Sequence, residues 1–208
     1  MVVLLTVTTL VILAGAGIWL LSREKRLAKA LAADESTGGI WFHPGHTWAA
    51  FQPAGVAKIG IDRFLRGILG RVDDVILPSE GRSVKQGDPL LTLAHGGRQV
   101  HLASPLDGVV CGVNLRRAND GEFSYKDDYL VVIRPTRIRA NMARMKEYRE
   151  EEGWFRAEMA KFKDFITFRM GTLQEVGATL ADGGTHTDGV VGKMDEATFK
   201  AFTETFLR

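Results

Sequence analysis

Residues 91–108 read LTLAHGGRQVHLASPLDG, and this stretch decides the fold of the region around it. Apolar residues alternate with polar ones on both sides of Gly96-Gly97, which is the pattern of two strands that each bury one face. A type I′ turn needs positive φ at both central residues, and two glycines adopt it without steric cost. The sequence therefore predicts a β-hairpin with Gly96-Gly97 as its turn, in which Leu93 faces Val100.

The hairpin belongs to a longer region of β-type sequence that runs from Ile40 to about Pro135. Short apolar runs alternate there with Gly, Pro and Asp; they are VAKIGI, GRVDDVIL, PLLTLA, RQVHLA, GVVCGVN and YLVVI. One interruption, DRFLRGIL at residues 62–69, has apolar residues in helical spacing and Asp62 as a natural N-cap. We expect an all-β module of residues 40–135 that contains one short helix.

The β-module also repeats itself along the chain. Three of its residues, Gly70, Val72 and Val75, are matched 38 residues later by Gly108, Val110 and Val113. Each copy places a turn glycine before an alternating apolar strand, and two such halves can close around one core. The repeat predicts a mainly β fold of the barrel-sandwich hybrid type.

Residues 136–208 change to charged sequence with apolar positions three and four apart, which predicts amphipathic helices. They form one long helix or two helices broken at Gly153, followed by a last helix that begins at Asp195 or Thr198. The helices can pack on the β-module or on a partner subunit, and because a closed barrel has its own core, we expect part of their apolar surface to meet another protein. The candidate docking residues are Met142, Met145, Trp154, Phe155, Met159, Phe162, Phe199, Phe202 and Phe206.

The N-terminal residues 2–21 carry no charge and include twelve Val, Leu or Ile residues. As a helix they would measure about 30 Å, the thickness of the hydrocarbon core of a bilayer. The basic residues follow this run and none precedes it, which favours a retained anchor over a cleaved signal peptide. We expect a single span in the inner (cytoplasmic) membrane, a juxtamembrane helix and linker at 22–39, the N-terminus outside, and residues 22–208 in the cytoplasm.

The β-module resembles the glycine cleavage system H protein family, a lipoyl-carrier fold of the biotinyl-lipoyl type. The resemblance covers about residues 41–135. It is carried by HTW at the first strand, VAKIGI before the short helix, LGRVDDVILPSEGRSVKQGDPL, and SPLDGVV before an asparagine. It implies a hairpin that presents one lysine for lipoyl attachment ahead of the Ala-Pro turn.

That lysine is absent from this chain. Counting back from Pro105 without a gap, its position falls on Gly97, next to Arg98, and no lysine occurs between Gln86 and Tyr125. An amide-linked lipoyl arm needs a primary amine, which the guanidinium of arginine does not supply. We therefore expect no lipoate and no other cofactor on the hairpin.

Other functional classes find little support in the sequence. The formal net charge is only +2, and basic and aromatic residues form no common stripe, which argues against nucleic acid as a partner. No serine or cysteine lies in a recognisable nucleophile motif, so we expect neither an enzyme nor a small-molecule substrate. His43 and His46, and Asp182 with His186 in the Gly-rich loop 182–192, lack the accompanying ligands of a metal site, so we expect no metal.

The leading hypothesis is a non-catalytic, membrane-anchored accessory subunit that scaffolds or docks other subunits of an inner-membrane complex. A redox or respiratory complex is the setting suggested by analogy with lipoyl carriers. One alternative is a working lipoyl or acyl carrier that is modified at another site. A second alternative is a membrane-fusion adaptor of a transport system, which also joins one span to a lipoyl-like barrel.

Overall fold

The computed structural model describes residues 39–70, 72–114, 128–147, 151–170 and 189–207. The predicted span at 2–21 and the juxtamembrane segment up to residue 38 lie outside these ranges. Within the described ranges, no helix is both long enough and apolar enough to cross a membrane.

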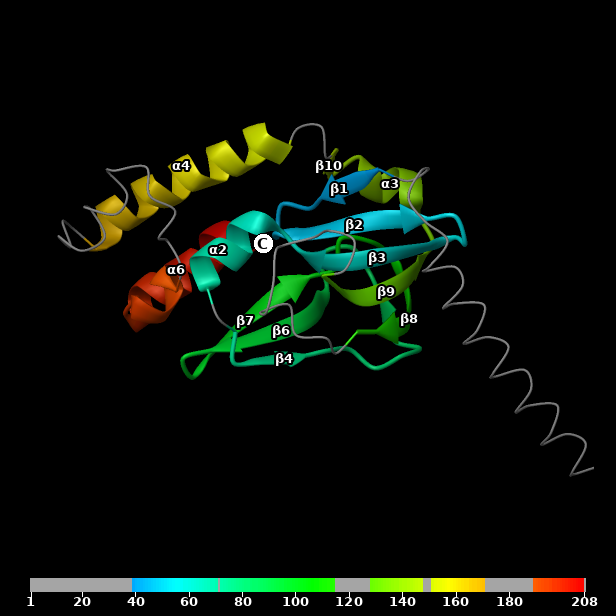
Figure 1. Cartoon of the computed structure of the whole chain (residues 1–208), viewed down its shortest axis with the longest axis horizontal. Helices are drawn as coiled ribbons and strands as arrows, with labels where there is room; N and C mark the ends of the chain where they lie inside the picture. Colours follow the sequence, from blue (N-terminus) through cyan, green and yellow to red (C-terminus); the bar gives the residue numbers. More distant parts are fainter. Residues whose placement is uncertain (1–38, 71, 115–127, 148–150, 171–188, 208) are drawn as a thin grey trace, which may run out of the picture.

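Two antiparallel sheets form the body of the molecule (Figure 1). The larger sheet has the order β10-β1-β2-β3-β9-β8-β5, and the smaller has the order β4-β6-β7. The strands of the larger sheet are β10 Lys146–Glu147, β1 Ile40–Phe42, β2 Thr47–Gln52, β3 Val56–Ile61, β9 Tyr129–Pro135, β8 Gly108–Val113 and β5 Ser83–Val84. Those of the smaller are β4 Asp74–Ile76, β6 Pro89–His95 and β7 Arg98–Ala103. The prediction of a mainly β module is confirmed.

The hairpin formed by β6 and β7 has the predicted register. Leu93 faces Val100, and His95 faces Arg98 on either side of the turn. Both turn glycines have positive φ, 56° at Gly96 and 77° at Gly97, as a type I′ turn requires. The apolar pair Leu93 and Val100 is buried, so one face of the hairpin joins the core.

The predicted short helix is present as α2, Arg63–Leu69. Asp62 caps it, since the Asp62 carboxylate accepts a hydrogen bond of 2.8 Å from the backbone N–H of Leu65. Phe64, Leu65, Ile68 and Leu69 are buried. Because these residues recur at three- and four-residue steps, α2 has a wide apolar face.

The C-terminal segments are α3 Ile138–Met142, α4 Glu151–Met170, the 3-10 turn η2 Val190–Lys193 and α6 Glu196–Phe206. The predicted break at Gly153 is wrong, because Gly153 lies inside the first turn of α4 and the chain leaves the helical path earlier, after Met142. Asp195 is the N-cap of α6, and its side chain accepts from the backbone N–H of Thr198 at 2.7 Å.

The C-terminal helices share one hydrophobic core with the β-module. Phe162 of α4 makes an edge contact with Phe64 of α2, with 5.8 Å between the ring centroids. Phe202 and Phe206 of α6 stack on each other at 5.3 Å in the same cluster. Figure 1 shows α2, α4 and α6 together at one end of the sheets. The helices and the β-module therefore form a single packing unit.

Candidate functional site

The tip of the β6–β7 hairpin is where the resemblance places the lipoyl lysine, and the turn backbone explains the residues found there. A Cβ atom added at Gly97 would meet nothing within 4 Å, so lack of space does not account for the glycine. The positive φ of both turn residues accounts for the glycines. The carboxylate of Asp73 fixes the turn by accepting a 2.7 Å hydrogen bond from Gly96 N–H.

Arg98, the residue after the turn, binds the C-terminal segment of the chain. Its guanidinium donates a 3.1 Å hydrogen bond to the carbonyl oxygen of Val191 and a second one to that of Met194. The same group lies 5.1 Å from the centroid of the Phe199 ring. A planar fork of N–H donors suits this simultaneous binding of two carbonyls and a ring. Arg98 thus fastens η2 and the start of α6 to the hairpin.

Gly192 brings η2 directly against the hairpin on the same side. A Cβ atom added at Gly192 would lie 2.5 Å from His95 Nε2, a distance that side chains do not tolerate. Nearby, the pKa of Asp195 is lowered, first by its hydrogen bonds with Thr198 and to a lesser degree by the charge of Arg98. The flank of the hairpin beside its tip is therefore covered by the protein's own C-terminal segment.

A second polar cluster lies where α4 crosses the β-module. His46 Nδ1 is 2.7 Å from the carboxylate of Asp62, and Trp154 Nε1 lies 3.4 Å from the same Asp62 oxygen. On the other side of the ring, His46 Nε2 is 3.9 Å from Glu158 Oε2. Neither atom has a hydrogen-bond partner among the described residues, although Lys161 Nζ lies 3.5 Å from the same Glu158 oxygen. His46 also adopts a φ of 60°, which is uncommon for a residue with a side chain.

This Asp-His pair has the orientation used for a general base, but it is enclosed. His46 is 1% exposed, and the rings of Phe64, Trp154 and Phe206 surround it at centroid distances of 4.6, 5.9 and 6.5 Å. A substrate could reach His46 only if α4 and α6 moved away. The cluster ties the C-terminal helices to the β-module rather than forming an open site.

The two histidines of HPGH do not assemble a metal site with other ligands. Within the described residues there is no group of three or more His, Cys, Asp or Glu side chains that could hold a metal ion. His43 Nδ1 instead accepts a 3.0 Å hydrogen bond from the Gly45 N–H. Asp182 and His186 of the Gly-rich loop lie outside the described residues.

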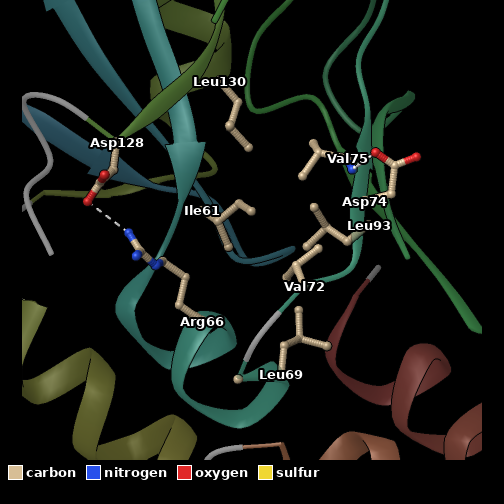
Figure 2. A pocket seen from close by; sticks show the side chains of 10 residues that line it. Ile61, Arg66, Leu69, Val72, Asp74, Val75, Leu93, Asp128 and Leu130 are labelled. Carbon is tan, nitrogen blue, oxygen red and sulfur yellow. Dashed lines mark hydrogen bonds and ion pairs between the residues drawn. The ribbon is translucent and has the colours of Figure 1, made fainter. Parts of the chain in front are cut away.

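An apolar cavity lies between α2, β4, β6 and β9, as Figure 2 shows. Arg66 and Asp128 close one side of it with a 2.9 Å ion pair. Its volume is about 40 Å³, room for about three water molecules and far below the several hundred Å³ of a typical small-molecule site. The cavity is too small to hold an organic cofactor.

The predicted docking residues fall into two groups. Met145, Phe162, Phe202 and Phe206 are buried inside the chain's own core, where they offer no surface to a partner. The others are half-buried: Met142, Trp154, Phe155, Met159 and Phe199. Of these, Phe155, Met159 and Phe199 pack against that core. Sequence reasoning missed Phe168 of α4, which is 85% exposed.

Comparisons with known proteins give the following relatives. The glycine cleavage system H protein of Hydrogenovibrio crunogenus is 32% identical over 77 residues, which are 37% of this chain and 60% of the relative. The glycine cleavage system H-like protein of Chlamydia muridarum is 26% identical over 83 residues, which are 40% of this chain and 71% of the relative. A crystal structure of a glycine cleavage system H protein from Mycobacterium marinum has a TM-score of 0.47 at 21% identity, over 57% of this chain and 98% of that one.

A model of the family described as "Glycine cleavage H-protein" matches residues 40–159. The match covers more than half of the chain. It begins at β1, contains both sheets and α2, and ends within α4. The chain therefore belongs to the glycine cleavage H-protein family.

Proposed function

We propose that this chain is a non-catalytic, non-lipoylated accessory subunit of a complex at the inner (cytoplasmic) membrane. Residues 2–21 anchor it, and residues 22–208 lie in the cytoplasm, where they scaffold or dock other subunits. A redox or respiratory complex is the setting that the carrier relationship suggests. The observation that carries the proposal is the hairpin, which has Gly97 at the lysine position and Arg98 fastened to the C-terminal segment.

The geometry supports a static role for the hairpin. A swinging arm requires an amine at an accessible tip, whereas here the residue beside the tip binds the carbonyls of Val191 and Met194. Gly192 packs against His95 on the same flank. A hairpin held in this way is suited to keep a surface in place.

The mass of the intact chain, purified from its own cells, tests the absence of a cofactor. We expect the mass of the unmodified polypeptide. An H protein that retains its lysine, isolated from the same cells, is the control and should show the lipoyl adduct. An added lipoyl-sized mass on this chain would overturn the proposal in favour of a carrier modified at another position.

Affinity capture tests the scaffold role. The membranes are extracted with a gentle detergent, and the chain is captured through a C-terminal tag. We expect a defined set of membrane-complex subunits to copurify with it. Phe168 is the most exposed large apolar side chain of the described residues, so Phe168→Ser should reduce the recovery of a partner that docks on α4. Lys163→Ser, at an exposed position of the same helix, is the matched control. A chain that behaves as a lone monomer at the membrane would contradict the proposal.

A further inference from the structure

Positive charge is concentrated around α3. Residues 134–146 contain five Lys or Arg residues and no Asp or Glu, although the net charge of the whole chain is only +2. Four of them define what we term the α3 basic surface, and all four are exposed: Arg134, Arg137, Arg139 and Arg144. Such a local excess creates a positive potential that attracts anionic groups.

Partly buried hydrogen bonds fix the orientation of α3. Asn141 is 3% exposed, and its side-chain oxygen accepts a 3.0 Å hydrogen bond from Asp107 N–H. Gln86 Nε2 donates to the Asn141 carbonyl, also at 3.0 Å. With Asn141 turned inward, Arg139 and Ile138 are left at the surface.

Among the described residues, the carboxylate of Asp107 approaches the α3 basic surface without neutralising it. Arg137 Nε lies 3.6 Å from Asp107 Oδ2, but the Arg137 side chain remains 72% exposed. Asp107 is only 14% exposed, but because the arginine side of the pair is open to solvent and the two groups are 3.6 Å apart, the pair is weak. Arg137 therefore remains available to a negatively charged surface.

Apolar side chains are exposed between these cations. Ile138 and Val109 are each 38% exposed, and they are two of the four large apolar residues exposed in the described parts of the chain. Val109 faces Arg134 across β8 and β9. Cations interspersed with isolated apolar side chains suit the interfacial region of an anionic bilayer, where both kinds of group are stabilised.

The chain enters the domain close to this surface. β1 begins at Ile40 and pairs with β10, which starts four residues after the end of α3. Figure 1 shows β1, β10 and α3 at the same end of the molecule, away from α6. Residues 22–39 separate the predicted span from β1, and 18 residues reach at most about 60 Å. A domain tethered so closely samples the membrane surface at high effective concentration.

From these observations we infer that the α3 basic surface lies against the anionic phospholipid headgroups of the membrane in which the chain is anchored. The inference rests on the proposed membrane anchorage and adds the orientation of the domain. The α3 end faces the bilayer, and α4 and α6 face away from it. The contact depends on phosphate-bearing headgroups and weakens as salt concentration rises.

Fluorescence quenching in reconstituted vesicles tests this orientation with the full chain. A fluorophore is attached at Ala140→Cys on α3 or at Ala160→Cys on α4, both exposed positions, and the lipids carry a headgroup quencher. In vesicles with about one third phosphatidylglycerol, we expect strong quenching at residue 140 and little at residue 160. In pure phosphatidylcholine or at high salt, the signal at residue 140 should fall toward that at residue 160.

Two matched charge variants show whether the arginines cause the contact. Replacing all four arginines of the α3 basic surface by Gln should remove most of the quenching at residue 140. Replacing four exposed cations elsewhere, Lys163, Arg169, Lys193 and Lys200, by Gln should leave it unchanged. Circular dichroism confirms that both variants remain folded.

Flotation of the same samples separates this inference from the proposed function. If the chain floats with anionic vesicles but residues 140 and 160 are quenched equally, the anchor stands and the orientation is wrong. The same result would follow if an acidic protein, rather than lipid, covers the α3 basic surface. If the chain does not float at all, both the anchorage and the lipid contact are contradicted.

Discussion

Trp48 and Gly60 form a contact that allows no side chain at residue 60. The Trp48 ring is fully buried, and its Nε1 donates a 3.0 Å hydrogen bond to the Ile61 carbonyl. A Cβ atom at Gly60 would lie 2.4 Å from the ring, so the buried ring or the strand would have to shift. We predict that Gly60→Ala lowers the free energy of unfolding by about 2 kcal/mol, measured by urea denaturation.

Gly67 provides the matched control for this substitution. It lies in α2, and a Cβ atom there would meet nothing within 4 Å. Because alanine favours helix over glycine, Gly67→Ala should leave stability unchanged or raise it by up to about 1 kcal/mol. If both alanine variants lose the same free energy of unfolding, the contact with Trp48 is not the cause of the loss at Gly60.

His43 gives the protein a pH-dependent stability. Burial, with smaller effects from the charges of His46 and Arg144, lowers the pKa of His43 from 6.5 to about 4. Between these values the unfolded chain binds a proton at His43 and the folded chain does not. The contribution of neutral His43 to the free energy of unfolding is therefore fully present above pH 6.5 and decreases as the pH falls toward 4. Below pH 4 about 3 kcal/mol of that free energy has been lost. Urea denaturation across this range measures the decline.

Two variants test the assignment to His43. His43→Asn retains an acceptor for Gly45 N–H but does not titrate, so its stability should depend less steeply on pH between 4 and 6.5. Gly45→Ala disturbs the same packing, since its Cβ would lie 3.2 Å from His43 Nδ1, yet it keeps the imidazole and the pH slope. Identical slopes in the wild type and His43→Asn would contradict the assignment.

Sequence reasoning at the residue scale succeeded where the determinant was local. Gly96 and Gly97 predict their own turn, because positive φ is a property of the residue and its immediate neighbours. The partners of His46 could not be predicted in this way. Its contacts are Asp62, the N-cap of α2, and Glu158 of α4, and no local pattern pairs residues that are so far apart in the sequence.

Among the elements, the attachment of η2 and α6 to the hairpin depends on Arg98. Arg98→Lys keeps the charge but replaces the planar fork by a single ammonium, which cannot bind the Val191 and Met194 carbonyls in the same way. We predict that amide hydrogen exchange within Glu196–Phe206 becomes about tenfold faster, as expected for the loss of about 1.4 kcal/mol of local stability. Exchange in β3 and β9 should not change.

Gln99→Lys is the control for the Arg98 variant. Gln99 is the neighbouring exposed residue of β7, so this substitution changes the hairpin surface without removing the guanidinium. Exchange in α6 should then match the wild type. If Arg98→Lys also leaves hydrogen exchange in α6 unchanged, the packing of Phe162, Phe202 and Phe206 holds the helix without help from the guanidinium contacts.

The helix break was predicted at Gly153 because glycine is unfavourable inside helices. In the structure Gly153 lies in the first turn of α4, where backbone N–H groups have no partner within the helix and the cost of glycine is small. The actual interruption includes β10, two residues long, which exists only because it pairs with β1. A strand stabilised by a partner a hundred positions away leaves no local signal.

At the scale of the whole molecule, the question of where the C-terminal helices pack was left open by the sequence. We expect the helices to have more apolar surface than a closed barrel can bury. The structure shows that α2 supplies the missing surface, since Phe64 contacts both Phe162 of α4 and Phe206 of α6. Four of the nine docking candidates chosen for their apolar spacing are therefore core residues, because spacing identifies a buried face but not the element that buries it.

The orientation of the whole chain across the membrane is the last prediction. The basic residues directly after residue 21 predict that residues 22–208 lie on the cytoplasmic side. A cysteine introduced at exposed Ser83 should react with a membrane-impermeant maleimide in inverted inner-membrane vesicles and not in intact spheroplasts. The native Cys111 is buried, so the wild type should stay unlabelled until it is denatured. Labelling in spheroplasts would place the β-module outside, as in a membrane-fusion adaptor, and would remove the basis for a cytoplasmic scaffold.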